Sequence, residues 1–278
     1  MIAKLKACLK KEKQIFKNII GAFFIKGASM FLALFTMPAY MKYFQDNIVL
    51  GVWFTILSFL NWVMMFDLGI GNGLRNKLPL TLEKKDNQSA KEYISSSYFS
   101  IALIAIILCF IFILVQPLLN WNSILNVSDI VISKEVLQTS VTIVIIGILI
   151  RFVLNLSTSI FYALQVSVVN NFLSFLSSFL IFAYVVLAPV GTVEQNLINL
   201  SYAHVLISNL PLLIATIFLF CKPLKGLAPN IKYFNLKKAR EILKIGTVLL
   251  WLQVVAMIVL STHSILITKL RNPAEVVE

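Results

Sequence analysis

Long apolar runs separated by short polar gaps occupy most of this chain of 278 residues. A helix that crosses the hydrocarbon core of a bilayer needs about 20 mostly apolar residues, and these runs are of that order or longer. They are too uniformly apolar for the alternating pattern of outer-membrane strands. We therefore predict an all-α protein, a polytopic transmembrane helical bundle of about seven spans. The predicted spans are 18–41, 48–72, 94–118, 137–163, 168–189, 197–221 and 242–268.

The composition agrees with this prediction, and the distribution of charge predicts an orientation. Hydrophobic residues make up 59% of the chain and charged residues only 13%, which excludes an ordinary soluble domain. The formal net charge is +12, and most basic residues lie in three clusters, at 1–17, 75–91 and 222–244. Basic loops stay on the cytoplasmic side of a membrane. We therefore predict a cytoplasmic N-terminus, and we expect no role in nucleic-acid binding.

The spans and gaps divide the chain into four predicted parts. Residues 1–17 form a basic amphipathic segment suited to an anionic membrane surface. Residues 18–221 form a first six-helix bundle, and residues 222–241 form a basic cytoplasmic linker. Residues 242–278 supply the first helix of an incomplete second bundle, because in a parallel repeat of six spans the seventh takes the place of the first.

The sequence contains no catalytic constellation. It has no Ser/His/Asp arrangement, no HExxH motif and no Walker phosphate loop. Cys8, Cys109 and Cys221 lack the spacing of metal ligands. His204 and His263 are isolated in the sequence, and we expect them to be packing residues. We predict a protein that is not an enzyme and uses neither a cofactor nor a metal.

Basic residues within or beside the spans are the candidates for substrate binding. A charge inside a span is costly and normally faces a cavity or a partner. Lys26, about one-third of the way into the first span, either lines a cationic cavity or snorkels to the inner interface. Arg151 lies deeper in the fourth span and either faces the cavity or pairs with Asp67 or a carbonyl. Arg75, at the inner mouth, either anchors its loop or contacts a phosphate.

A glycine-rich segment ends the second predicted span. Gly69, Gly71 and Gly73 are expected to break the helix and to form a turn or gate at the inner membrane face. Asp67 precedes them. It is either a helix-end residue paired with a nearby lysine or part of a gate salt bridge with Arg75 or Arg151.

Small polar residues are concentrated in the fourth and fifth predicted spans. They either allow close packing of helices or line a hydrated cavity that hydrogen-bonds sugars. The residues predicted to face a glycan are Asn155, Asn170, Asn171 and Ser174.

Four short motifs resemble the opening half of Wzx-type polysaccharide exporters. These exporters are lipid-linked oligosaccharide flippases of the MOP, or MATE-like, superfamily. The resemblance covers most of the chain and is strongest over residues 36–100. Its motifs are Pro38-x-Tyr40, Gly51-x-Trp53, FDLGIGNGLRNK at 66–77 and ISSSYFS at 94–100.

The resemblance implies a fold and a function. It implies two six-helix bundles around a cationic cavity in a bacterial inner membrane, with alternating access to its two sides. The implied substrate is an undecaprenyl-pyrophosphate-linked oligosaccharide for O-antigen, capsule or exopolysaccharide synthesis. Membrane lipids, a polysaccharide polymerase and glycosyltransferases are the implied partners. Members of the family have about twelve spans, so we expect this chain to be a fragment or to assemble with another polypeptide.

Two other functions remain open at this point. A multidrug or cation antiporter of the same superfamily would need a carboxylate within the membrane, and Asp67 is the available candidate. A non-transporting membrane scaffold or a gene remnant would also fit a chain that ends after about seven spans.

Overall fold

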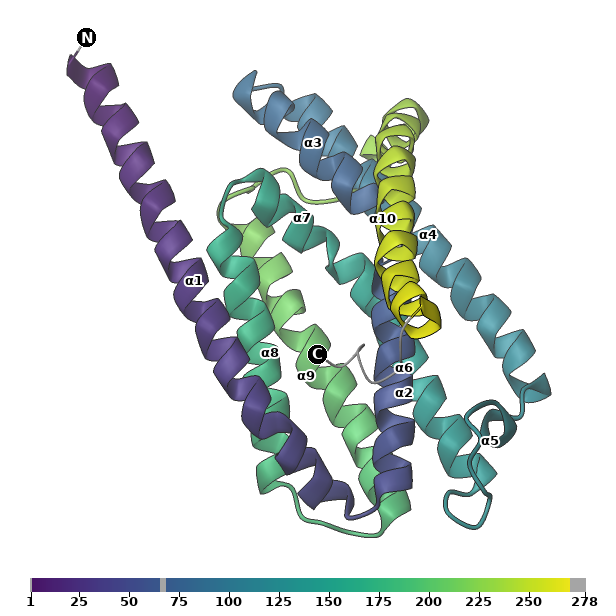
Figure 1. The fold of residues 1–278 in the computed structure, drawn as a ribbon. Coiled ribbons are helices and arrows are strands. Elements are labelled where there is room, and N and C mark those ends of the chain that lie inside the picture. Colours follow the sequence, from purple (N-terminus) through teal and green to yellow (C-terminus); the bar gives the residue numbers. More distant parts are fainter. Residues whose placement is uncertain (1, 66–68, 271–278) are drawn as a thin grey trace.

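The computed structural model describes residues 2–65 and 69–270, and these ranges contain helices and connecting turns but no strand (Figure 1). The all-α prediction is therefore confirmed. The longer helices are α1 (Ile2–Phe44), α2 (Asn47–Met65), α3 (Ile70–Glu83), α4 (Asn87–Val115), α6 (Lys134–Leu154), α8 (Ser167–Leu187), α9 (Val193–Cys221) and α10 (Leu236–Leu270). The shorter ones are α5 (Trp121–Ile124), α7 (Leu156–Ala163) and the 3₁₀ turns Gln116–Leu118 and Ile231–Tyr233.

Five helical segments of the described chain are long and apolar enough to cross a membrane. They correspond to the first predicted span and to the third to sixth, so the prediction of a multi-span bundle is confirmed. The second predicted span, 48–72, includes residues 66–68, which lie outside the description, and the seventh, 242–268, lies within helix α10. That these two segments cross the membrane stays a prediction. The five segments are Ile20–Phe44, Asn87–Leu118, Lys134–Ala163, Ser167–Leu187 and Val193–Cys221.

Large apolar side chains on the outside of the bundle fit a lipid environment. Phe24 on α1 is 81% exposed, and Phe110 on α4 is 63% exposed. Soluble monomers rarely expose wide apolar patches, whereas hydrocarbon chains accept such side chains without cost. The outward faces of α1 and α4 are therefore suited to contact with lipid.

The three basic clusters gather at one end of the bundle. The N-terminus of α1, helix α3 and the start of α10 lie at this end, and the turns at 45–46 and 188–192 lie at the opposite end (Figure 1). We call the first of these the basic end. The segregation of positive charge to one end is the arrangement that the positive-inside rule describes.

Several element boundaries differ from the prediction, among them a break at Asn155, which divides the fourth predicted span into α6 and α7. The basic segment 1–17 and the first span form one continuous helix, α1, from Ile2 to Phe44. Helix α10 begins at Leu236, inside the predicted linker. Asn235 is the reason, because its Oδ1 accepts a hydrogen bond from the backbone N–H of Lys237 at 3.0 Å and so caps the first turn.

A close contact between α3 and α10 depends on glycine. Gly69 has a φ of +70°, which glycine adopts readily, and the chain turns there as predicted. Gly71 and Gly73 lie inside α3 instead of extending the turn. A Cβ atom on Gly73 would overlap Ile242, and one on Gly246 would overlap the backbone of Gly69. The two helices therefore meet almost backbone to backbone.

The segment between α9 and α10 is bonded to the start of α4. The Ser95 hydroxyl accepts a hydrogen bond from the backbone N–H of Asn230 at 3.1 Å. The Ser96 hydroxyl accepts one from the Asn235 N–H at 2.9 Å and donates one to the Asn235 carbonyl at 3.1 Å. Both serines are buried, so this segment lies in a defined position across α4.

Glu241 joins three helices at the basic end. Its carboxylate on α10 accepts a hydrogen bond from the Tyr93 hydroxyl of α4 and lies 3.4 Å from Nζ of Lys77 on α3. The hydrogen bond from Tyr93 is the main cause that holds the pKa of the Glu241 carboxyl below its ordinary value, and Lys77 and Lys238 add to it. The hydrogen bond and the ion pair of Glu241 therefore hold α10 against α4 and α3, in addition to the glycine contact between α3 and α10.

We expect Gly246→Ala to destabilise the protein by about 1–3 kcal/mol, the usual cost of overpacking a tight contact. The added methyl group would overlap the Gly69 backbone. The measurement is the free energy of unfolding in detergent micelles as denaturant is added. Gly27→Ala is the matched control, because a Cβ there meets no atom within 4 Å and alanine favours the helix. An equal loss in both variants would contradict the close contact.

We expect Glu241→Gln to lower the melting temperature at neutral pH and to flatten its dependence on acid pH. The folded pKa of this carboxyl is lowered, so the ionised group stabilises the fold above its unfolded pKa of about 4.3. That contribution is lost as the pH falls through the folded pKa. The measurement is Tm between about pH 3 and pH 8. The exposed Glu135 supplies the control Glu135→Gln, and parallel curves for wild type and Glu241→Gln would refute the role of this carboxylate.

Candidate functional site

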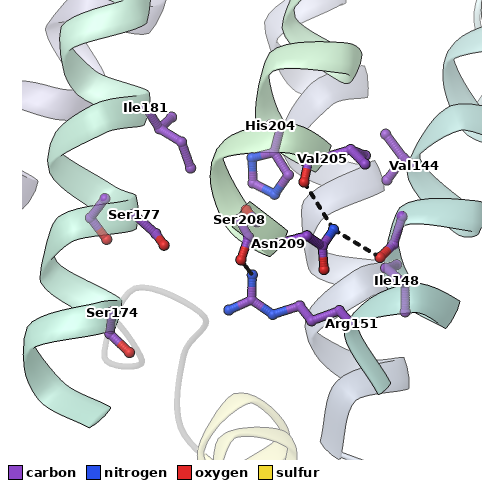
Figure 2. A pocket seen from close by; sticks show the side chains of 12 residues that line it. Val144, Ile148, Arg151, Ser174, Ser177, Ile181, His204, Val205, Ser208 and Asn209 are labelled. Atoms are coloured by element: carbon purple, nitrogen blue, oxygen red, sulfur yellow. Dashed lines mark hydrogen bonds between the residues drawn. The ribbon is translucent and has the colours of Figure 1, made fainter. Parts of the chain in front are cut away.

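Two cavities with polar side chains in their walls lie between the helices, next to each other. The larger, of about 380 Å³, lies between α6, α8 and α9 (Figure 2). The smaller, of about 170 Å³, extends from it along α7 and the first half of α8. Arg151, Ser174 and Ser177 line both cavities, so the two form one continuous polar region with Arg151 at the junction.

Arg151 carries the positive charge of this region. It lies in the last turn of α6, and its guanidinium extends into the space between α8 and α9 (Figure 2). One guanidinium N–H donates to the backbone carbonyl of Ser208 at 3.1 Å, although arginine has five N–H donors. The residues that line the two cavities include no Asp or Glu. The charge of Arg151 therefore has no counter-ion among the cavity residues.

Helix α9 supplies three polar side chains to the larger cavity. His204, Ser208 and Asn209 line it within little more than one turn. The Asn209 amide donates to the Gly147 carbonyl of α6 at 3.1 Å and to the Val205 carbonyl at 2.9 Å. This side chain therefore ties α9 to α6 beside the arginine. His204 is held by Trp53, because the two rings meet edge to face with centroids 5.5 Å apart.

The smaller cavity is built around the break between α6 and α7. Asn155 stands between the two helices, and the Thr158 hydroxyl donates to its carbonyl at 2.7 Å. The Asn170 amide of α8 donates to the Thr158 carbonyl at 2.9 Å. Asn155, Thr158 and Asn170 all line the cavity, as does Tyr162. The break thus presents carboxamides and hydroxyls to the interior of the bundle.

Arg75 contacts a residue of the smaller cavity but does not line either cavity itself. Its guanidinium carbon is 4.5 Å from the centroid of the Tyr162 ring, a cation–π contact. Tyr162 lines the cavity and is 37% exposed. A second arginine, on α3 at the basic end, therefore lies next to a residue of the cavity wall.

The structure brings together five of the residues predicted from the sequence to bind substrate. They lie on α6, on α8 and at the break between α6 and α7, and each of them lines at least one of the two cavities. They are Arg151, Asn155, Asn170, Asn171 and Ser174.

The other predicted residues lie elsewhere. Lys26 is exposed on α1 and does not line either cavity. Gly71 and Gly73 are buried in α3, where Gly73 packs against α10. Asp67, with its predicted salt bridges, lies outside the described residues. Of the glycine-rich segment, Gly69 alone forms a turn within the described part of the chain.

Several cavity residues were not predicted as site residues. They are Ser177, Ser178, His204, Ser208 and Asn209. A signal for some of them is present in the sequence, because residues four apart lie on the same face of a helix. Asn170, Ser174 and Ser178 repeat at that interval on α8, and His204 and Ser208 do so on α9.

Comparisons with protein-family models, with curated proteins and with solved structures gave no match for this chain. The resemblance to Wzx-type exporters therefore stays a prediction that rests on the quoted motifs.

We expect the cavity to favour anions. A cysteine at Ser174, introduced after Cys8, Cys109 and Cys221 are replaced by alanine, should react faster with an anionic thiosulfonate than with a cationic one. We expect a rate ratio of at least about fivefold, because the uncompensated charge of Arg151 attracts the anion. The measurement is the labelling rate of the purified protein with each reagent.

Two further variants control this labelling experiment. When Arg151→Gln is added, the ratio of the anionic to the cationic labelling rate should fall close to the ratio that the same two reagents show with a free thiol in solution. A cysteine at Ser128, exposed in the loop that precedes α6, should show no dependence on Arg151. A rate ratio at position 174, with Arg151 in place, that favours the anionic reagent no more than the ratio with a free thiol would refute an anion-selective cavity.

Proposed function

We propose that this chain takes part in carrying an undecaprenyl-pyrophosphate-linked oligosaccharide across a bacterial inner membrane, for O-antigen, capsule or exopolysaccharide synthesis. In this proposal Arg151 binds the pyrophosphate, and the polar residues around it hydrate the glycan. The N-terminus and the basic end face the cytoplasm, where the substrate is made. A polysaccharide polymerase and glycosyltransferases are the expected partners.

The observation that carries this proposal is the position of Arg151. Its guanidinium reaches polar cavities, is bonded to one carbonyl, and meets no carboxylate among the cavity residues. A guanidinium presents paired N–H donors that match phosphate oxygens, and charge-assisted hydrogen bonds are about twice as strong as neutral ones. Removal from bulk water strengthens the attraction further. A phosphoryl anion would therefore supply the missing counter-ion.

The rest of the site supports the same substrate. Carboxamides and hydroxyls of α7, α8 and α9 offer hydrogen bonds to sugar hydroxyls. Arg75 on Tyr162 places a second cation toward the basic end, where it would attract the substrate before it reaches Arg151. The exposed apolar faces of α1 and α4 leave the polyprenyl chain in contact with lipid.

The cation antiporter is less well supported. Such a protein needs a carboxylate that faces its substrate or coupling ion, and the lining residues of both cavities include none. The positive charge of Arg151 would repel a cationic drug. A scaffold has no need of an uncompensated charge within the bundle, so the position of Arg151 does not favour the scaffold hypothesis.

We expect the purified chain in lipid nanodiscs to bind geranyl pyrophosphate, a short soluble prenyl pyrophosphate. Arg151→Gln should weaken binding at least about tenfold, because it removes charge-assisted hydrogen bonds. Titration calorimetry measures the two dissociation constants. Lys134→Gln is the matched control, because Lys134 is exposed at the other end of the same helix, and it should bind as the wild type does.

Two outcomes would contradict the proposal. One is equal binding of geranyl pyrophosphate by the wild type and by Arg151→Gln. The other is binding of a lipophilic cation such as tetraphenylphosphonium in place of the pyrophosphate, which would favour the antiporter.

A further inference from the structure

Asn170 has a buried oxygen with no partner among the described residues. Its side chain is 6% exposed and lines the smaller cavity. Its Nδ2 donates to the Thr158 carbonyl at 2.9 Å. A carbonyl can only accept, so the amide orientation is determined by this bond. Oδ1 is therefore the atom that remains without a hydrogen bond in the described chain.

An unpaired buried acceptor is rare in proteins, since such oxygens nearly always meet a donor or an ordered water. Two hydroxyl groups near Asn170 donate their hydrogen bonds to other acceptors. The Thr158 hydroxyl donates to Asn155, and the Ser177 hydroxyl donates to the Ile207 carbonyl at 3.3 Å. A donor for Asn170 would then come from a molecule in the cavity that this side chain lines.

Arg151 lines the same cavity as Asn170. The wall of the cavity thus combines a cation without a counter-ion and an acceptor without a donor. The complementary ligand carries a negative charge and, close to it, a hydrogen-bond donor. Fully ionised inorganic pyrophosphate and the phosphate group of a diacyl lipid carry the negative charge, but they offer hydrogen-bond acceptors and not the donor that Asn170 needs. A sugar linked to phosphate offers hydroxyl donors within one ring of it.

We propose that the smaller cavity is a glycosyl subsite, in which the sugar attached directly to the phosphate donates a hydroxyl or amide N–H to Asn170 Oδ1 while Arg151 holds the phosphate. This inference rests on the proposed function and adds a requirement to it. The site selects for a sugar phosphate and not for any phosphoryl anion. Asn170 is then a specificity residue, and Arg151 supplies the general affinity.

The experiment compares two soluble phosphate monoesters of equal charge, glucose 1-phosphate and methyl phosphate. The purified full chain in nanodiscs is titrated with each. We expect glucose 1-phosphate to bind about tenfold more tightly, the effect of about one well-formed hydrogen bond. Asn170→Leu, which has a similar volume, should reduce this ratio to about one, because it removes the acceptor that the sugar needs. Retained binding of methyl phosphate also shows that the variant is folded.

Asn76→Leu is the matched control. Asn76 is an exposed asparagine on α3 that does not line either cavity, so this variant should keep the tenfold preference. Should Asn170→Leu fail to fold, Asn170→Ser takes its place, because a serine hydroxyl can still donate to a backbone carbonyl.

The outcomes separate the two proposals. Equal affinity of the wild type for both esters, or a preference that survives in the Asn170 variant, overturns the glycosyl subsite and leaves the anion site in place. Failure of the wild type to bind either ester, or binding that Arg151→Gln does not weaken, overturns the proposed function and the subsite with it.

Discussion

Close contact between helix backbones is the constraint on which this structure depends. In hydrocarbon, helices gain little from burying apolar side chains against one another, so small residues and interhelical hydrogen bonds hold a bundle together. A Cβ on Gly147 of α6 would overlap Val205 of α9, and Asn209 bonds across the same contact. The α6–α9 pair therefore forms one unit, and Arg151 projects from it close to Asn209.

The polar interior follows from this unit. Helix α6 ends at Leu154 and α7 begins at Leu156. Because α6 and α9 are held close, this break lies inside the bundle. Polar groups at such a break are tolerated at membrane depth when they line a cavity or find partners. Thr158 and Asn170 partly satisfy each other, and the remaining capacity faces the cavities. The uncompensated charge of Arg151 and the unpaired oxygen of Asn170 are thus features of one wall.

The basic end shows how α10 is joined to the helices before it. The glycine contact with α3, the hydrogen bonds of Asn235 to Ser96 and the contacts of Glu241 all hold the start of α10 against α3 and α4. The division into a first bundle and a second bundle that begins at 242 stays a prediction. The start of α10 nevertheless packs as part of the group of helices that precedes it, and any rocking motion in the proposed transport cycle would move it with α3 and α4.

The sequence by itself determined the helical class, the position of most spans and the segregation of positive charge, because membrane spans must be apolar over a fixed length and basic loops lie on one side. It also identified Arg151 and the asparagines of the fourth and fifth spans, since charge and amide groups are costly there. The tertiary structure alone decided that α9 contributes His204 and Asn209 to the same cavity and that Lys26 does not line it. The reason is physical: helical periodicity places residues on a face of their own helix, whereas the meeting of two faces depends on contacts such as Gly147 with Val205, between residues far apart in the chain.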